Sequence, residues 1–124
     1  TPQWLLEAGD VRRMPLEQLS ESARKAGFLI VEAHPFRYDS VIMDDRLLDG
    51  VEVYNANKNH DSHDYLAELW AEKKHLIRTT GSDFHDPHDH TAAGIMTEEP
   101  IEDNETLLRV LRSGAYELIR PDMD

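Results

Sequence analysis

Amphipathic stretches and nearly continuous apolar stretches alternate along most of the chain. After Pro15, apolar residues recur at helical spacing as far as Gly27, which predicts an amphipathic helix with a proline near its start and a glycine after its end. Residues 28–33 are almost all apolar, as in a parallel strand buried on both faces. Residues 51–54 alternate instead, so we expect a shorter strand in which Glu52 is the polar member.

The second half of the chain continues this order of helix and strand. Asp61 or Ser62 can cap a helix that runs to Lys74. Further elements are expected as strands at residues 76–80, 92–97 and 116–119, and as a helix that Asp103 caps and Gly114 ends. The order contains βα units, so we expect an α/β fold of mostly parallel strands with helices outside. Residues 1–124 fit a single domain or a fragment of one.

Composition excludes several classes of function and site. The chain has 13 basic and 25 acidic residues, and a net charge of −12 opposes direct binding to DNA or RNA. It has no cysteine, so a disulfide or a thiolate metal site is excluded. No apolar run has the length of a membrane span and the N-terminus lacks a secretory pattern, so we expect a cytoplasmic protein with no membrane partner. A start at Thr1 rather than Met suggests a mature or excised piece.

Polar side chains follow the apolar strands at the points where these strands are expected to end. His34 and Arg37 follow the first, Asn55 and Asn57 the second, and Asp83 and His85 the third. The carboxyl ends of parallel strands meet at one edge of a sheet, where ligands bind. Asp83 and His85 are two residues apart, so both can leave one face of an extended chain. Imidazole and carboxylate together suit Zn, Mn or Fe, whereas oxygen ligands alone would suit Ca or Mg.

The same edge carries a group that suits phosphate. The guanidinium of Arg37 has the fork geometry that matches a phosphate group. A divalent ion polarises a phosphoryl oxygen and lowers the pKa of bound water from 15.7 to about 7. An acidic surface is compatible with a small phosphorylated substrate, because bound cations reverse the local charge. The sequence therefore predicts metal-assisted hydrolysis of a phosphoester.

Other polar residues have two interpretations each. Glu52 would be a ligand or a base beside a metal if it pointed inward, but we favour an outward, solvated strand residue. His88 and His90 have the spacing of a His-x-His ligand pair, yet the Asp86-Pro87 dipeptide before them favours a hydrated turn. The residue types alone leave both alternatives open.

Four segments of the chain resemble the second half of a PHP domain, the polymerase and histidinol phosphatase family. They are residues 32–37, 48–55, 81–85 and 107–114, and the resemblance extends from about residue 15 to residue 119. It implies the C-terminal half of a distorted (β/α)7 barrel, with a cluster of up to three divalent ions at the carboxyl ends of the strands. It also implies hydrolysis of phosphate esters, with the substrate left open among nucleotide, sugar, histidinol and aryl phosphates.

The resemblance also implies roles for individual residues. His34 corresponds to the histidine ligand of the family's His-Pro segment, and Asp83 and His85 correspond to its closing ligands, which makes these two the implied catalytic pair. Arg37 and Asn55 match positions where contact with the substrate phosphate is expected.

The chain departs from the family in its first third. A complete member opens with a His-x-His pair on its first strand, and nothing before residue 34 resembles it. An alternative is therefore a non-catalytic partial module that binds metal weakly or mediates contact with a partner or subunit. In that alternative the exposed strand edges would be covered, for example by a second copy in a homodimer.

Overall fold

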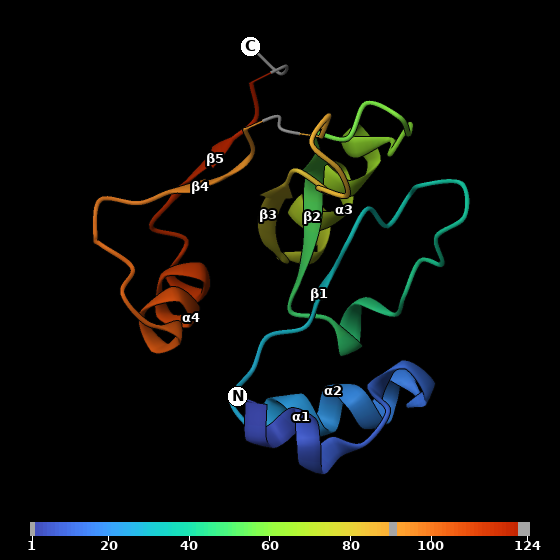
Figure 1. Ribbon diagram of the computed structural model, residues 1–124, viewed down its shortest axis with the longest axis vertical. Coiled ribbons are helices and arrows are strands. Elements are labelled where there is room, and N and C mark those ends of the chain that lie inside the picture. Colours follow the sequence, from blue (N-terminus) through green and yellow to red (C-terminus); the bar gives the residue numbers. More distant parts are fainter. Residues whose placement is uncertain (1, 90–91, 122–124) are drawn as a thin grey trace.

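The computed structural model describes residues 2–89 and 92–121 (Figure 1). In chain order its elements are the helix α1 (Pro2–Ala8), the 3-10 turn η1 (Val11–Arg13), α2 (Leu16–Lys25), β1 (Val31–Glu32), the 3-10 turn η2 (Asp45–Leu47), β2 (Gly50–Asn55), α3 (Asp64–Lys74), β3 (Ile77–Gly81), β4 (Gly94–Met96), α4 (Asn104–Ser113) and β5 (Glu117–Ile119). This order alternates strands and helices over residues 50–81, as predicted.

The strands form two small sheets. In the first sheet the parallel order is β1-β2-β3, and α3 connects β2 to β3. In the second sheet β4 pairs with β5 in antiparallel orientation. The α/β class is thus confirmed. The finer expectation of a (β/α)7 barrel is not shown. The described residues contain fewer strands than such a barrel, and these strands do not close into one.

The ends of α2 and α4 follow the predicted capping chemistry. Pro15 is the N-cap of α2, and Gly27 beyond its end adopts a φ of +81°. The Asp103 carboxylate accepts a hydrogen bond from the backbone N–H of Thr106 at 2.7 Å, and Gly114 ends α4 with a φ of +74°. Among the described residues, no helix has both the length and the apolar character needed to cross a membrane.

The start of α3 differs from the prediction. Its N-cap is His63, in a left-handed conformation with a φ of +48°, so the expected caps Asp61 and Ser62 are wrong. The reason lies in other hydrogen bonds of these side chains. The Ser62 hydroxyl accepts from Arg37, and the Asp61 carboxylate accepts from the backbone N–H of His63.

The first strand is shorter than the apolar run that predicted it. The run covers residues 28–33, whereas β1 is Val31–Glu32. The backbone N–H of Ile30 donates to the Asp49 carboxylate at 2.8 Å, and the Ile30 carbonyl accepts from the N–H groups of Asp49 and Gly50. These bonds tie Ile30 to the turn before β2, so the parallel ladder begins only after it.

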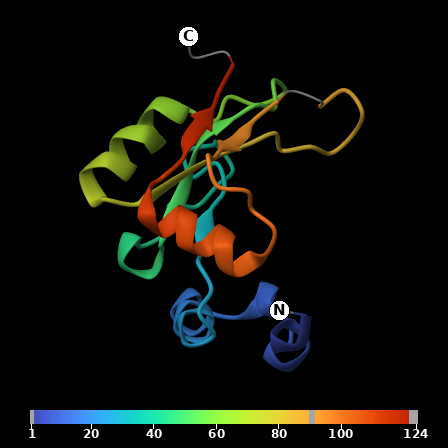
Figure 2. The ribbon, with the colours of Figure 1, turned by 90° about the vertical axis from the view of Figure 1, so that its left-hand side faces the viewer.

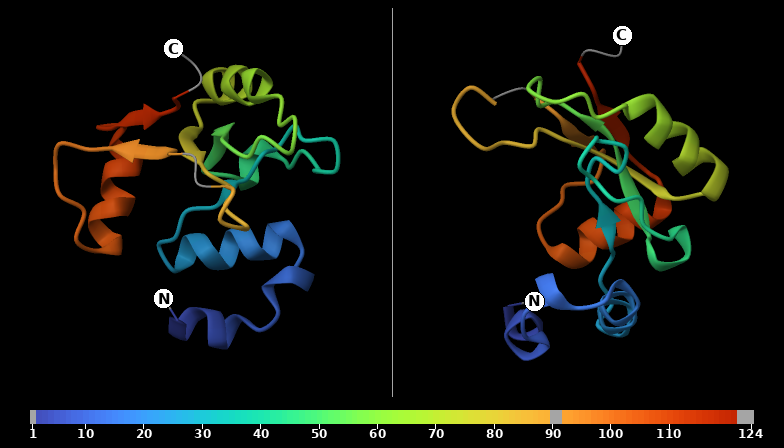
Figure 3. Two further views of the ribbon diagram at one scale, coloured as in Figure 1. Left: turned by 45° about the horizontal axis from the view of Figure 1, so that its top comes forward. Right: turned by 90° about the vertical axis from the view of Figure 1, so that its right-hand side faces the viewer.

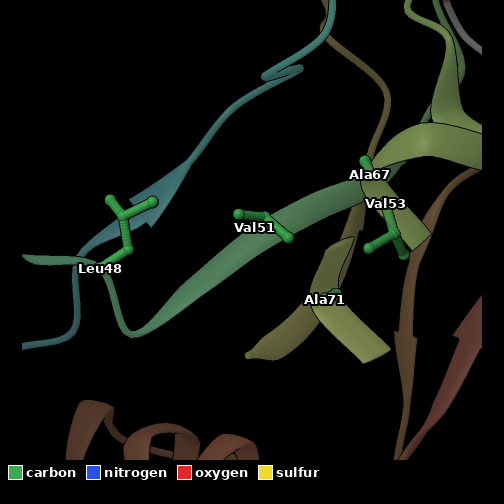
Figure 4. Packing of buried hydrophobic residues seen from close by; sticks show 5 residues of the cluster. All are labelled: Leu48, Val51, Val53, Ala67 and Ala71. Atoms are coloured by element: carbon green, nitrogen blue, oxygen red, sulfur yellow. The ribbon is translucent and has the colours of Figure 1, made fainter. Parts of the chain in front are cut away.

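The core lies between β2 and α3 (Figure 4). Its buried cluster consists of Leu48, Val51, Val53, Ala67 and Ala71. Val51 is completely buried, and small alanine side chains on α3 let the helix approach the strand closely. The core therefore fixes β2 as the rigid centre of the first sheet.

Residues 2–13 contribute α1 and η1 to a separate helical layer with α2. This layer lies at one end of the molecule and apart from the sheets in both views of Figure 3. The ring of Trp4 packs edge-on against Phe28, with ring centroids 5.3 Å apart. The Arg24 guanidinium donates to the carbonyls of Arg46 and Leu48, which joins α2 to the segment before β2.

The second sheet joins the first through β3. The Thr80 hydroxyl accepts the backbone N–H of Gly94 at 2.7 Å and lies 2.9 Å from the Ile119 carbonyl, so it contacts both β4 and β5. The Tyr116 hydroxyl donates to the Arg78 carbonyl at 2.8 Å. Figure 2 shows α4 in orange-red below the β4–β5 pair.

Candidate functional site

The three parallel strands end at the same edge of the first sheet, and the predicted site residues lie there. Asn55 is the last residue of β2, His34 follows β1, and Asp83 and His85 follow β3. Because β1, β2 and β3 are parallel, the loops after them leave the sheet at one end (Figure 1). We call this edge the rim, meaning residues 33–43, 55–64 and 82–89.

The best-defined contact of the rim is the ion pair between Arg37 and Asp83. Arg37 Nη2 lies 2.9 Å from Asp83 Oδ2, and the two side chains are 9% and 14% exposed. Arg37 Nε and Nη2 also donate to the Ser62 hydroxyl at 3.3 and 3.1 Å. Burial acts to raise the pKa of Asp83, but the Arg37 guanidinium outweighs it and, with Asn55 and His85, holds that pKa below its usual value.

His85 is held beside Asp83 in a defined tautomer. His85 Nδ1 lies 2.8 Å from the Asp83 carbonyl oxygen and 3.4 Å from Oδ1 of the same residue. A nitrogen that faces a carbonyl must carry the proton, so the lone pair of the neutral ring is on Nε2. His34 is oriented through the same ring atom, since its Nδ1 lies 3.0 Å from Ser40 Oγ. Metal-ligating histidines are commonly held in this way by partners of the other nitrogen.

Two of the predicted ligands have a backbone conformation that is uncommon for residues with a Cβ. His34 has a φ of +32° and Asp83 a φ of +51°, in the left-handed region that favours glycine. Such a conformation costs on the order of 1 kcal/mol or more for a residue with a Cβ, and it concentrates at functional sites. The surrounding contacts must therefore hold both residues in place.

Glu52 is buried, and the expectation that it is a solvated strand residue is wrong. Its side chain is 9% exposed, and Oε2 accepts the backbone N–H of His34 at 2.9 Å and Nδ2 of Asn55 at 3.0 Å. Every residue of β2 is buried, because the strand is central in its sheet and α3 covers it. Glu52 thus binds rim residues from its position on β2, and we include it in the rim.

Two further residues of the rim were not predicted as site residues. Asp64 Oδ2 accepts the backbone N–H of Asn55 at 3.2 Å, and Asn57 Nδ2 donates to the Asp83 carbonyl at 3.2 Å. Burial raises the pKa of Asp64, and the negative charge of Glu52 raises it further. The sequence did indicate Asn57, since it follows the strand that ends at Asn55. Asp64 could have been found as well, because the helix after this strand starts at the same edge of the sheet.

The loop after His85 is organised by Asp89 rather than by histidine. Asp89 is buried, and its Oδ2 accepts the backbone N–H groups of His85 at 3.1 Å and Asp86 at 3.2 Å. His88 is exposed, with its backbone N–H bound to Asp86 Oδ1 at 2.8 Å, which agrees with the hydrated turn. His90 lies outside the described residues.

The structure brings some of the predicted site residues together and connects others indirectly. Asp83 contacts both Arg37 and His85, whereas His34 reaches Asn55 through Glu52. Over residues 2–89 and 92–121, no group of three or more histidine and carboxylate side chains is arranged around one point where a metal ion would sit. The donor types nevertheless suit a borderline divalent ion, because imidazole nitrogens of His34 and His85 and one oxygen of Asp83 remain outside the Arg37 pair.

Comparison of the chain with family models, with curated proteins and with solved structures finds no match. These comparisons therefore neither support nor oppose the PHP resemblance. The assignment of site residues depends on the motifs in the sequence and on the geometry of the rim.

Proposed function

We propose that the rim is part of the active site of a metal-dependent phosphoesterase, as in the C-terminal half of a PHP-like (β/α)7 barrel. The observation that carries this proposal is the pairing of Asp83 with His85 at the end of β3, with the imidazole lone pair on Nε2. The left-handed backbone at His34 and Asp83 supports it, because neither residue ends a helix and such conformations cluster at active sites.

Each predicted site residue has a role in this proposal. His34, Asp83 and His85 would hold Zn, Mn or Fe, which lowers the pKa of bound water and polarises a phosphoryl oxygen. Arg37 neutralises Asp83 in the buried part of the rim, and its Nη1 donates no hydrogen bond within the described residues, so that edge can face a phosphate oxygen. Asn55 is fixed by Glu52 and Asp64 next to the same loop, where its amide supports contact with the phosphate.

Removal of either member of the pair is expected to remove bound metal. Asp83→Asn takes away the carboxylate charge but keeps a residue that tolerates a positive φ. His85→Ala removes an exposed ring that does not touch Arg37, so the folded state should be retained. We expect each variant to weaken binding of Mn²⁺ or Zn²⁺ at least about tenfold, measured by calorimetry and by elemental analysis, because even indirect partners of a metal contribute 10–100-fold.

A matched control is available in the same loop region. Asp39→Asn changes an exposed aspartate of the rim that is not one of the proposed ligands, and its metal content should equal that of the unchanged protein. Circular dichroism establishes that each variant is folded. Unchanged metal content in folded Asp83→Asn and His85→Ala would refute the proposed site, even if the protein hydrolysed an aryl phosphate.

A second candidate function is an association module, and the exposed surface of the chain favours it. The accessible surface is 8515 Å², whereas a compact monomer of 14.3 kDa exposes about 6800 Å². Large apolar side chains contribute to this excess, among them Leu6, Tyr38, Val41 and Ile42. The excess is about twice the area that one partner buries in a standard protein interface, which is about 800 Å².

This candidate predicts self-association that depends on concentration. Light scattering over a hundredfold range of protein concentration should then give a mass that rises from one chain to two. Val41→Asp and Ile42→Asp, which place charge on the exposed apolar segment, should return the mass to one chain. A constant mass of one chain over the whole range would contradict homodimer formation.

A further inference from the structure

The carboxylate of Glu52 lies at the centre of the rim, although it is not one of the predicted ligands. It is on β2, the central strand of the first sheet, and its Oε2 accepts hydrogen bonds from the backbone of His34 and from Asn55 Nδ2. Among the described residues it forms no ion pair with arginine or lysine. These hydrogen bonds are therefore what offsets the cost of burying its charge.

The other oxygen of Glu52 contacts the end of β3. A Cβ atom placed on Gly81 would lie only 2.4 Å from Glu52 Oε1, closer than real side-chain contacts allow. Position 81 thus has room for the carboxylate because it is glycine. Glu52 consequently touches the ends of all three parallel strands, at His34 after β1, at Asn55 on β2 and at Gly81 on β3.

Hydrogen bonds extend this contact to Asp83. The Asn55 side chain, held by Glu52, accepts the backbone N–H of Asn57 at Oδ1, 3.0 Å away. Asn57 Nδ2 in turn donates to the carbonyl of Asp83 at 3.2 Å. Glu52 therefore contacts one left-handed residue, His34, directly and the other, Asp83, through two asparagines.

We infer that Glu52 is a positioning residue, which holds His34 and Asp83 in the conformations that let them share a divalent ion. This inference rests on the proposed function. Glu52 acts as a hydrogen-bond acceptor for the rim and not as a ligand. Its Oε2 accepts both hydrogen bonds and its Oε1 lies against Gly81, so the contribution that these contacts assign to it is the preorganisation of other side chains.

Two substitutions separate positioning from ligation. Glu52→Gln keeps an oxygen that can accept from both His34 and Asn55, whereas Glu52→Ala removes the acceptor. With Mn²⁺ as the probe, we expect Glu52→Ala to weaken binding 10–100-fold and Glu52→Gln to stay within about threefold of the unchanged protein. Equal, large losses in Glu52→Gln and Glu52→Ala would mean that the charge itself binds the ion, and would overturn the inference.

A third variant displaces Glu52 without changing it. Gly81→Ala introduces the Cβ that collides with Oε1, so it should weaken Mn²⁺ binding about as much as Glu52→Ala while the carboxylate is retained. Glu72→Ala, at an exposed position of α3, is the matched control and should leave Mn²⁺ affinity unchanged. If Glu52→Ala does not fold, Gly81→Ala and Glu52→Gln still test whether Glu52 positions the ligands.

Hydrogen exchange distinguishes failure of this inference from failure of the proposed function. If the unchanged protein binds no Mn²⁺, the proposed function fails, and positioning is judged from the backbone amide of His34 without metal. Glu52→Ala should then raise the exchange rate of that amide at least about tenfold, whereas Glu52→Gln should leave it near the original rate. An unchanged rate in Glu52→Ala would show that Glu52 does not hold His34.

Discussion

Replacement of Arg37 by leucine is expected to lower the free energy of unfolding by about 3 kcal/mol, because it leaves the Asp83 carboxylate without its cation in a largely buried position. The substitution also removes both hydrogen bonds to Ser62, so the rim loses a link between three loops. Urea unfolding at pH 7, followed by circular dichroism, measures the difference. The double variant Arg37→Leu with Asp83→Asn should recover part of the loss, since neither partner then carries an unpaired charge.

The effect of Arg37→Leu should depend on pH in a defined direction. The pKa of Asp83 in the folded protein is below the ordinary value of 3.8, so the ion pair stabilises the protein above that pH. As the pH falls through the lowered pKa, Asp83 takes up a proton and the stabilisation is lost. The difference between the unchanged protein and the variant should therefore shrink below pH 4.

A surface arginine provides the control for this experiment. Arg46 forms an ion pair with Asp44 at 2.6 Å, but both side chains are exposed. Exposed pairs contribute little, so Arg46→Leu should leave the unfolding curve unchanged within error. An equal loss of stability in Arg46→Leu and Arg37→Leu would contradict the assigned importance of burial at the rim.

Replacement of Val51 by aspartate is expected to cost more than about 4 kcal/mol and to leave much of the protein unfolded at room temperature. Val51 is fully buried on the central strand, within the cluster that packs β2 against α3 (Figure 4). A carboxylate at this position has only apolar neighbours in the cluster, which are Leu48, Val53, Ala67 and Ala71. The far-ultraviolet circular dichroism spectrum and the urea midpoint should both show the loss.

The same chemical change at an exposed valine is the control. Val41 is 74% exposed in the loop after β1, and Val41→Asp should change stability by less than about 0.5 kcal/mol. A folded Val51→Asp protein with near-normal stability would mean that the β2–α3 cluster is not the core. Measurement at low protein concentration keeps any self-association through the exposed segment out of the comparison.

Local chemistry along the chain predicted the class of the fold and the ends of two helices. The Asp103 cap and the Gly114 terminus of α4 depend on a few neighbouring residues, and so do Pro15 and Gly27 around α2. The apolar run at 28–33 predicted a strand in the right place but not its length. That length depends on the Asp49 side chain, which lies near Ile30 only after folding.

The part of the site that could not be predicted is the part formed by long-range contacts. Alternation of Val51, Glu52 and Val53 is typical of a half-exposed strand, but β2 is covered on both faces. The burial of Glu52 depends on donors from a loop 18 residues earlier and from Asn55. Position along the chain did indicate that Asp83 and His85 lie at a strand end. That Arg37 would form the ion pair with Asp83 follows only from the loop geometry.

The guanidinium of Arg37 couples the motions of the three rim loops in the native state. It belongs to the loop after β1, binds Ser62 in the loop before α3 and binds Asp83 in the loop after β3. A fluctuation that frees the loop after β1 must break its bonds to both other loops, whereas release of either of those breaks only its own bonds to Arg37. Opening of the loop after β1 is therefore coupled to both neighbours, and a ligand that orders this loop also lowers the entropy cost of ordering them.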